Sequence, residues 1–552
     1  MGLSHDSAMQ PPVDVASNPF DLEFGLVADM IRLHARRDPR HPALVDARRS
    51  LAYGELDTLM DRIGATLQRD GVGPQQRIAI CASASVEYAA VFLGALRAGV
   101  VVAPLAPGET AKSLAGMLSD SGAKLLFVDA GTAASFPGTT APDVPRIGLD
   151  GSSAGRPFED WLAPAGTVPA PVAPGPDWPF NIIYSSGTTG TPKGIVQPHA
   201  MRWAQVRRGG GAYGYGPDAV TLVATPLYSN TTLVVFLPTM AWGGCAVLMP
   251  KFNALEYLRL AQRHRVTHAM LVPVQYQRLM ALPEFGEFDL SSFRMKFCTS
   301  APFAAALKAD VLARWPGGLV EFYGMTEGGG SCALAAHEHP DKLHTVGQPM
   351  EGHDIRLLDD DGRELGPGAI GEVVGRSGSM MLGYHGQPAK TREAEWWSPA
   401  GERFIRTGDV GRFDAEGFLT LLDRKKDMVI SGGFNIYPSD LEAALREHPA
   451  VADAAVVGVP SEQWGETPVG FVVRREGHRE SEAELLQWFN QRIGKTQRLA
   501  ALHFIAELPR SAIGKVLKRE LRELHRTLAL HQNGAPASVH QDDHDLSPQG
   551  RP

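Results

Sequence analysis

Short apolar runs alternate with amphipathic segments over residues 26–128. In the first amphipathic segment, residues 26–37, the side chains of Leu26, Met30 and Leu33 are spaced to lie on one face of a helix. Further helices are predicted over 54–67, 86–98 and 114–121, and strands over 43–45, 77–82, 100–105 and 124–128. Strands that alternate with helices are typical of βαβ units, so this pattern predicts a mostly parallel sheet.

The same alternation returns further along the chain. Strands are predicted over 220–225, 246–249 and 269–272, with a helix over 255–264. Residues 151–178 are rich in Pro, Gly, Ala and Ser and are predicted to be a surface connection. The glycine-rich stretch 209–216 follows no strand, so a flexible loop is favoured over a phosphate-binding turn. We therefore expect an α/β fold whose large N-terminal domain holds two mostly parallel sheets.

The pattern changes twice towards the C-terminus. From Ile355 onward, short strands separated by turns predict a small β subdomain. After Arg424 the apolar segments are shorter and carry more charge between them, which places a domain boundary at Lys425–Lys426. The N-terminal domain then spans 21–425, and a small α+β domain spans 426–527. Residues 1–20 are predicted to be a loose arm, and residues 528–552, which lack apolar periodicity, a disordered tail.

Composition narrows the class of protein. Lys and Arg number 53 against 61 Asp and Glu, a net charge of −8, which disfavours nucleic acid or an anionic membrane surface as the main partner. No apolar run reaches membrane-spanning length, and the N-terminus lacks the basic start and apolar core of a secretory signal. Four scattered cysteines without a CxxC pair are typical of reduced core thiols. We expect a cytoplasmic protein, either a monomer or a homodimer.

Residues 184–195 read YSSGTTGTPKGI and concentrate hydroxyl groups, glycines and one lysine. Glycines let the backbone approach a ligand closely, and hydroxyls with a lysine suit a polyphosphate. The segment is not a Walker P-loop, because Lys193 is followed by Gly194 instead of Ser or Thr. The alternative is a polar surface hairpin. The candidate phosphate contacts are Ser185, Ser186, Gly187, Thr188, Thr189, Gly190 and Lys193.

Residues 321–327 read EFYGMTE and place the hydroxyl of Thr326 beside the carboxylate of Glu327. A phosphate oxygen and a Mg²⁺ ion would use that pair, although a polar cap at a strand end is the alternative. Residues 406–409 read RTGD, and Asp409 at a strand end could accept hydrogen bonds from two ribose hydroxyls.

Three further segments lie near or beyond the domain boundary. Residues 423–427 read DRKKD, with Arg424 able to reach a ribose or a phosphate, and residues 431–438 read SGGFNIYP, a loop led by glycines. Residues 509–515 read PRSAIGK, a turn in which Gly514 exposes Lys515. Taken alone, an exposed lysine is more often only a solvated charge.

In this order and at this spacing, the motifs resemble those of the adenylate-forming superfamily, which includes acyl-CoA synthetases, adenylation domains of peptide synthetases and firefly luciferase. The resemblance extends from about Leu26 to about Leu524. It implies that the loop at 185–193 holds the β- and γ-phosphates of ATP and that Tyr323 stacks on the adenine. The segment Ser300-Ala301-Pro302 would pack on the same base.

The resemblance also implies the roles of the remaining motif residues. Thr326 would contact the α-phosphate, Glu327 would hold Mg²⁺, and Asp409 would bind the ribose with Arg424 close by. Lys515 would bridge the attacking carboxylate and the α-phosphate. Lys426 matches the hinge about which a mobile C-terminal domain turns. The loop that would line the pantetheine tunnel of coenzyme A consists of Ser431, Gly432, Gly433 and Phe434.

The implied reaction is chemically coherent. A carboxylate is a poor electrophile, and attack on the α-phosphorus of ATP converts it to an acyl-adenylate from which AMP leaves easily. That step brings two anions together, so Mg²⁺ and a lysine must offset charge. The second step needs a route for a thiol, which rotation of the small domain would supply. The sequence thus predicts a carboxylic acid–CoA ligase that uses ATP and coenzyme A.

Candidate residues of the acyl pocket come from three segments: Tyr228, Ser229, Asn230, Leu233, Val274, Tyr276, Gly328 and Gly329. Many acyl-CoA synthetases have a histidine where this chain has Ser229. Tyr228, Leu233, Val274 and Tyr276 are apolar or aromatic, and the polar groups of these segments are hydroxyls and amides without a lysine, arginine or acid. An apolar aromatic or medium-chain aliphatic acid is therefore expected. A dicarboxylate such as malonate is expected to be a poor substrate unless Arg278 turns inward. The three glycines Gly328 to Gly330 are expected to leave room for a flat ring.

Three alternatives differ in the acceptor or in the class of protein. A pattern FDxS, which supplies an aspartate to the ammonium group of an amino acid, is missing, which argues against an amino-acid substrate. An enzyme that loads a separate carrier protein remains the first rival to a CoA ligase. A non-catalytic nucleotide-binding protein would be expected to have lost Lys515, Glu327 or the phosphate loop, and all three are present.

Overall fold

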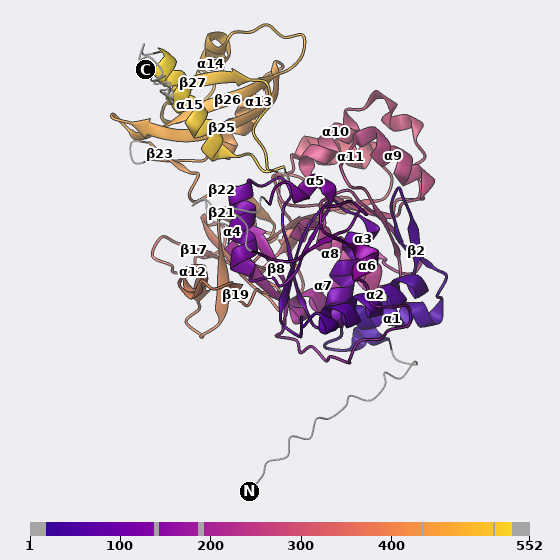
Figure 1. Ribbon diagram of the computed structural model, residues 1–552. Helices are drawn as coiled ribbons and strands as arrows, with labels where there is room; N and C mark the ends of the chain where they lie inside the picture. Colours follow the sequence, from indigo (N-terminus) through magenta and orange to yellow (C-terminus); the bar gives the residue numbers. More distant parts are fainter. Residues whose placement is uncertain (1–17, 137–142, 186–192, 432–433, 512–513, 533–552) are drawn as a thin grey trace, which may run out of the picture. The chain divides into compact units, whose positions relative to one another are not determined.

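The computed structural model describes residues 18–136, 143–185, 193–431, 434–511 and 514–532 (Figure 1). The chain forms two compact units. The first spans Met1–Leu422 with Ala512–Gly514, and the second spans Asp423–Ser511 with Lys515–Pro552. The second unit thus begins at Asp423, close to the domain boundary predicted at Lys425–Lys426.

The first sheet of the first unit has eight strands in the order β19-β9-β8-β4-β3-β5-β6-β7. The pairs β8–β9 and β9–β19 are antiparallel, at one edge, and the other pairs are parallel. The predicted buried strands therefore take up the parallel part of the sheet. The strands are β3 (Arg77–Cys81), β4 (Val101–Pro104), β5 (Leu126–Val128), β6 (Arg146–Gly148), β7 (Arg156–Pro157), β8 (Pro179–Ser185), β9 (Lys193–Pro198) and β19 (Gly383–Tyr384).

The second sheet has nine strands in the order β16-β15-β14-β13-β12-β10-β11-β1-β2. Its six central strands, from β14 to β1, pair in parallel, and the antiparallel pairs lie at the two edges. The strands are β1 (Pro42–Val45), β2 (Ser50–Ala52), β10 (Val220–Val223), β11 (Cys245–Leu248), β12 (His268–Leu271), β13 (Met295–Cys298), β14 (Gly318–Tyr323), β15 (Cys332–Ala335) and β16 (Gln348–Pro349).

The helices of the first unit are α1 (Val27–Arg37), α2 (Tyr53–Arg69), α3 (Val86–Arg97), α4 (Ala111–Ser121), α5 (Ala130–Ala133), α6 (Phe158–Trp161), α7 (His199–Tyr213), α8 (Asn230–Ala241), α9 (Ala254–Arg263), α10 (Pro273–Met280), α11 (Ala305–Arg314) and α12 (Pro388–Glu393). Ile63 of α2, Phe92 of α3 and Phe236 of α8 share one buried cluster with Ile80 of β3 and Leu248 of β11. This core joins both sheets, and the predicted fold of two mostly parallel sheets is confirmed.

The prediction of a flexible loop at 209–216 is wrong over residues 209–213, which belong to α7. A Cβ atom on Gly210 would lie 2.1 Å from the Trp242 ring. The glycine is therefore needed because α7 passes very close to that ring, and the sequence pattern alone does not separate this role from that of a loop glycine.

Two segments predicted to be loose or irregular contain packed structure. Within the connection 151–178, Phe158 and Trp161 of α6 are buried, and the Trp161 indole donates a 2.7 Å hydrogen bond to Asp70. At the end of the predicted arm, the 3₁₀ turn Pro19–Asp21 buries Phe20, whose ring centroid lies 3.6 Å from that of Trp242. Aromatic side chains in otherwise polar stretches were the signal for both.

The small β subdomain predicted from residue 355 is a separate sheet of five strands. The pairs that join four of its strands are antiparallel. Asp409 lies inside its longest strand and not at a strand end as predicted. The strands are β17 (Asp354–Leu358), β18 (Gly371–Arg376), β20 (Glu395–Trp397), β21 (Arg403–Phe413) and β22 (Leu419–Arg424).

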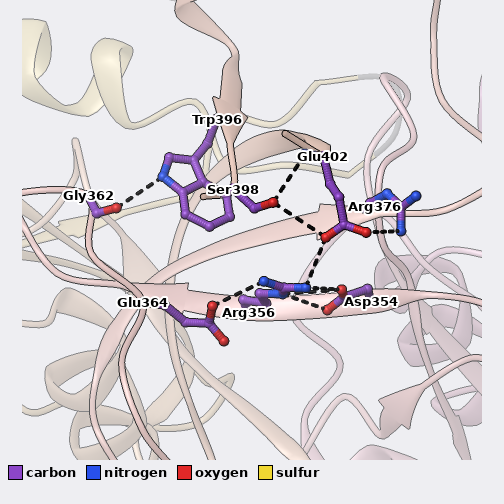
Figure 2. Close-up of polar contacts among 8 residues, drawn as sticks. All are labelled: Asp354, Arg356, Gly362, Glu364, Arg376, Trp396, Ser398 and Glu402. Carbon is purple, nitrogen blue, oxygen red and sulfur yellow. Dashed lines mark hydrogen bonds and ion pairs between the residues drawn. The ribbon is translucent and has the colours of Figure 1, made fainter. Parts of the chain in front are cut away.

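An ion-pair network crosses this sheet (Figure 2). The Arg356 guanidinium lies 2.7 Å from Asp354, 3.1 Å from Glu364 and 3.4 Å from Glu402. Glu402 also pairs with Arg376 at 3.1 Å, so it lies between two arginines, as Figure 2 shows. The network links β17 to β18 and to the segment between β20 and β21, and it supports the strand that carries Asp409.

The second unit is a five-stranded sheet between helices. Along β25, Val456 packs in one cluster with Leu441 of α13 and Leu485 of α14, while its neighbour Val457 packs with Leu521 of α15. The two faces of the sheet are therefore covered by different helices. The elements are β23 (Val429–Ser431), β24 (Phe434–Ile436), β25 (Val451–Ser461), β26 (Gly465–Arg474), β27 (Ala501–Ile505), α13 (Pro438–Arg446), α14 (Glu482–Asn490) and α15 (Lys518–Gln532).

Helix α15 corrects the predicted tail. It continues to Gln532, so the prediction of disorder from residue 528 is wrong for 528–532. Residues 533–552 lie outside the described part of the chain.

Candidate active site

Four of the predicted site segments follow four neighbouring parallel strands. Strands β10, β12, β13 and β14 lie side by side in the second sheet, and parallel strands end at the same edge. The segments that leave this edge are 226–230 after β10, 273–276 after β12, 300–302 after β13 and 324–329 after β14. The topology thus brings candidate adenine, phosphate and acyl contacts to one edge, as ligand sites in open α/β sheets require.

The position of Ser229 has a structural explanation. Its hydroxyl accepts a 3.3 Å hydrogen bond from the Thr231 amide, and Ser229 is the N-cap of α8. Serine is among the best N-cap residues, because its oxygen satisfies one of the free N–H groups of the first turn. Ser229 therefore begins the helix that carries Asn230 and Leu233.

Ser300 is tied to the same helix. The hydroxyls of Ser300 and Thr231 lie 2.6 Å apart, which fixes the segment after β13 against the N-terminus of α8. Ser300 has φ of +83°, a conformation that costs free energy for a residue other than glycine. Such backbone strain is concentrated at functional sites, and here it turns the segment 300–302 at the sheet edge.

Tyr323 and Asp409 meet in a buried hydrogen bond. The Tyr323 phenol donates to Asp409 Oδ2 at 2.8 Å, and both side chains are less than a tenth exposed. The main-chain amide of Asp409 donates to the hydroxyl of Thr407, which donates to the Val373 carbonyl. Burial and the nearby carboxylate raise the pKa of the Tyr323 phenol well above its usual value, so it remains a donor at neutral pH. The predicted adenine and ribose contacts are therefore adjacent.

The strand that delivers Tyr323 is held by a buried ion pair. The ammonium group of Lys308 on α11 contacts the Glu321 carboxylate and donates to the carbonyls of Leu343 and Thr345. Burial raises the pKa of Glu321 to about 7, and the neighbouring ammonium only partly offsets this. The pair fixes β14 two residues before Tyr323.

Glu327 is oriented by a tyrosine that the sequence analysis missed. The Tyr384 phenol donates to Glu327 Oε1 at 2.8 Å, and the Lys193 ammonium lies 4.9 Å from the centroid of the Tyr384 ring. Tyr384 stands in β19, which pairs with β9 next to the predicted phosphate loop. Burial and the carboxylate raise the pKa of this phenol. The only local signal was an aromatic residue between glycines in the sequence GYHG at 383–386.

The three glycines after Glu327 serve close packing. Gly328 and Gly329 have φ of +78° and +85°. A Cβ on Gly328 would lie 2.0 Å from the Ser379 carbonyl oxygen, and one on Gly329 would lie 2.8 Å from that of Gly375. Main chain fills the space beside these glycines, so the expectation that they leave room there for a ring is wrong.

The residues proposed as acyl-pocket walls divide into two groups. Tyr228, Asn230 and Val274 are half-buried at the sheet edge. Tyr276 has no exposed surface, its hydroxyl donates to the Phe297 carbonyl, and it packs in the second core; Leu233 is 1% exposed and packs in the first. In this structure those two side chains serve the core. Arg278, the candidate for turning inward, is exposed on α10.

Several predicted contacts lie outside the described residues. Ser186, Gly187, Thr188, Thr189 and Gly190 belong to the connection between β8 and β9, and Gly432 and Gly433 to the connection between β23 and β24. The flanking positions are described: Ser185 pairs with Lys193 across the β8–β9 hairpin, and Ser431 pairs with Phe434.

The remaining predicted residues belong to the second unit and are described within it. Lys515 is exposed in a turn closed by a 2.8 Å hydrogen bond from the Ser511 amide to the Lys515 carbonyl. Arg424 and Lys426 are exposed near the start of the unit, and Phe434 is 59% exposed. The roles of these residues stay predictions.

The residues that are present suit a magnesium ion better than a protein-bound transition metal. Among the described residues, no group of three or more His, Cys, Asp or Glu side chains could hold a metal. Mg²⁺ needs only one or two carboxylates when substrate phosphates supply the other oxygens, and Glu327 is the carboxylate predicted for this role. Within the described ranges, every helix is too short or too polar to cross a membrane.

The chain belongs to the AMP-binding enzyme family: the family model matches residues 31–385, and the model of the AMP-binding enzyme C-terminal domain matches residues 440–515. The resemblance to the adenylate-forming superfamily is thereby confirmed. The fold of this chain is similar to that of ATP-bound MatB from Rhodopseudomonas palustris, with a TM-score of 0.82 and 30% sequence identity. The match covers 91% of this chain and 99% of MatB.

Two relatives align with this chain over most of its length and most of their own. The fatty acid–[acyl-carrier-protein] ligase ScoC of Streptomyces coeruleorubidus is 32% identical over 502 residues, 89% of this chain and 94% of ScoC. The indoleacetate–CoA ligase of Aromatoleum aromaticum is 32% identical over 514 residues, 90% of this chain and 98% of that enzyme. The relatives are ligases that differ in both the acid and the thiol acceptor.

Replacing Tyr384 by phenylalanine tests how Glu327 is oriented. The change keeps the ring beside Lys193 but removes the phenol that donates to Glu327. Loss of a partner that orients a metal ligand typically weakens metal binding, so we expect the Mg²⁺ concentration that half-saturates ATP binding to rise about 10-fold or more. Isothermal titration calorimetry with ATP at varied Mg²⁺ measures this value.

Tyr53→Phe is the control, because it also removes a buried phenol, one that donates to the carbonyls of Met240 and Gly244. It should leave the Mg²⁺ dependence unchanged. Equal Mg²⁺ dependence in Tyr384→Phe and the wild-type protein would mean that Glu327 does not hold the ion or does not need Tyr384.

Proposed function

We propose that the protein is an ATP-dependent acid–thiol ligase that acts through an acyl-adenylate and converts a carboxylic acid, ATP and coenzyme A to an acyl-CoA, AMP and pyrophosphate. The observation that carries the proposal is the 2.8 Å bond between Tyr323 and Asp409, because it joins an aromatic ring suited to adenine and a carboxylate suited to a ribose. Thr326, three residues after Tyr323, offers a hydroxyl for a phosphate, and Glu327 offers a carboxylate for a cation. The CoA and acyl-carrier-protein ligases among the relatives support the same class of reaction.

In the first half-reaction, a carboxylate oxygen attacks the α-phosphorus of ATP, and pyrophosphate leaves. We assign the α-phosphate contact to Thr326, the adenine contact to Tyr323 with residues 300–302, and the ribose contact to Asp409 with Arg424. The loop at 185–193 would hold the β- and γ-phosphates. Glu327 would hold Mg²⁺, which when bound offsets the phosphate charge.

Lys515 would act only in this step, where its ammonium lies between two anions that approach each other. In the second half-reaction, the thiolate of coenzyme A attacks the acyl carbon, and AMP leaves with the bridging oxygen. We assign the thiol route to the loop from Ser431 to Phe434 and the exchange of Lys515 for that loop to rotation about Lys426.

A carrier protein is the second candidate acceptor. It is favoured by the relative ScoC, which is named as a ligase of a fatty acid to an acyl-carrier protein. Coenzyme A and a carrier protein both present a phosphopantetheine thiol, so the adenylation residues assigned above serve either acceptor. Parallel assays with coenzyme A and a phosphopantetheinylated carrier protein distinguish the two.

The acid that we propose is an apolar monocarboxylic acid, aromatic or medium-chain aliphatic. The half-buried candidate wall residues Tyr228 and Val274 offer an aromatic and an aliphatic surface, and Asn230 is neutral. Arg278, the nearby cation, is exposed. A second carboxylate buried without a cationic partner would cost several kcal/mol.

A panel of acids tests this proposal directly. Each assay contains ATP, coenzyme A and one acid: benzoate, indole-3-acetate, octanoate or malonate. With the apolar acid that the protein uses best, we expect pyrophosphate release coupled to CoA consumption. The kcat/KM for malonate should be at least about 100-fold below that for the best apolar acid, since each 1.4 kcal/mol is a factor of ten. A higher kcat/KM for malonate would contradict the assignment of the pocket, and Arg278→Ala would then show which cation is used.

Lys515→Ala tests the division between the two half-reactions. ATP–pyrophosphate exchange should fall on the order of 10²-fold, as for loss of one electrostatic stabiliser of a transition state. Thioester formation from presynthesised acyl-adenylate should be largely retained. Lys495→Ala, which removes another exposed lysine of the same unit, is the control and should change neither rate. Equal damage to both half-reactions by Lys515→Ala would remove the assignment.

A further inference from the structure

A buried polar cluster lies behind the candidate active site, between the β8–β9 hairpin and α7. Asn181 of β8, Gln197 of β9 and Arg202 of α7 are each 0% exposed. Their side chains contact one another, and none belongs to the motifs considered above. Polar groups buried this deeply must be hydrogen-bonded, so their partners determine what the cluster does.

The guanidinium of Arg202 determines which way both amides point. Arg202 has only donors, and it reaches the Oδ1 atom of Asn181 at 3.3 Å and the Oε1 atom of Gln197. The Nδ2 atom of Asn181 then donates to Gln197 Oε1 at 3.0 Å. Because Oε1 of Gln197 is the acceptor for both neighbours, its Nε2 group must point the other way.

That other direction leads to the candidate site. Gln197 Nε2 donates to the Thr326 main-chain carbonyl at 2.7 Å and to Asn230 Oδ1 at 3.3 Å. Thr326 belongs to the turn assigned to the α-phosphate, and Asn230 to the edge assigned to the acid. One amide group thus holds both segments, although they follow different strands.

The charge of Arg202 is costly where it stands. In the described part of the chain no ion pair is formed with Arg202, and its acceptors are neutral amides, including Gln205 Oε1 at 2.9 Å. Burial lowers the pKa of the guanidinium to about 9. A buried charge without a partner of opposite sign is an expensive way to fill a core. A guanidinium is nevertheless well suited to set the direction of several amides at once, because its donors form a rigid fork.

We propose that Arg202 and Gln197 are positioning residues for adenylation: Arg202 orients the Gln197 amide, and Gln197 holds the Thr326 turn and the Asn230 side chain in register. The inference rests on the proposed function, since it assigns the α-phosphate to the Thr326 turn and the acid to the Asn230 edge. Loss of the Gln197 donor should therefore lower kcat through Thr326 and raise the KM for the acid through Asn230, with a smaller effect on protein stability.

Gln197→Glu separates positioning from stability. The new carboxylate keeps an acceptor for Arg202 and adds an ion pair, so the cluster remains satisfied on that side. It offers no N–H to Thr326 or Asn230, and its second oxygen would face the Thr326 carbonyl. Arg202→Lys is the second variant, because it keeps the charge but lacks the fork that fixes both amides. Gln205→Ala is the matched control, since it removes a contact of the same guanidinium through Nη1, the nitrogen that reaches neither Asn181 nor Gln197.

The experiment measures melting temperature and the kinetics of hydroxamate formation from ATP, hydroxylamine and whichever of benzoate, indole-3-acetate and octanoate the wild-type protein uses best. For Gln197→Glu we expect a melting temperature near that of the wild type, a kcat lower by about 10- to 100-fold and a several-fold higher KM for the acid. Arg202→Lys should show the same split between kinetics and stability, and Gln205→Ala should retain wild-type kinetics.

Wild-type kinetics in Gln197→Glu would overturn the inference. It would also be overturned if Gln197→Glu and Arg202→Lys lost activity only because their melting temperatures fell and less protein was folded at the assay temperature. If the wild-type protein forms no hydroxamate with any of the three acids or with malonate, the proposed function itself fails, and the inference fails with it. The two failures are thus distinguished by the behaviour of the wild-type protein.

Discussion

The carboxyl ends of β10, β12, β13 and β14 meet at one edge of the second sheet because the four strands are parallel and adjacent. This constraint brings together segments as far apart in the sequence as 226–230 and 324–329, and the other features of the site refine it. Each segment must still be held in place once it leaves the sheet, and the structure uses side-chain hydrogen bonds for that purpose. The Ser300–Thr231 contact joins two of these segments. The Tyr323–Asp409 and Tyr384–Glu327 contacts tie the end of β14 and the turn after it to strands of two other sheets.

Close packing of the main chain is the second physical theme. The glycines at 328–330 and Gly210 stand where a Cβ atom would meet main chain or an aromatic ring. In both places the sequence pattern predicted open space or flexibility at the glycines. The structure shows the opposite: glycine permits contact that any other residue would prevent, and such contacts hold the turn after Glu327 against residues 375–379.

The sequence was sufficient for those features that depend on local pattern. Alternating strands and helices predicted the two parallel sheets, and Tyr323 and Glu327 were found because their motif stands at the end of β14. Asp409 was found from its motif alone, because it lies inside β21 and not at a strand end as predicted. Tyr384, Gln197 and Arg202 were missed because their relevance depends on pairings between distant segments. The β9–β19 pair brings Tyr384 to Glu327, and α7 returns Arg202 to β8 and β9. Ser229 was noticed as a departure, but its role as an N-cap required the position of α8.

The proposed adenylation requires that a carboxylate oxygen of the substrate attack the α-phosphorus of ATP. Oxygen transfer tests it most directly: an acid labelled with ¹⁸O in both carboxylate oxygens is converted in the presence of ATP and coenzyme A, and the nucleotide and phosphate products are analysed by mass spectrometry. Attack on the α-phosphorus predicts one ¹⁸O atom in the phosphate of AMP and none in pyrophosphate. Formation of ADP, or label in pyrophosphate or inorganic phosphate with unlabelled AMP, would contradict it.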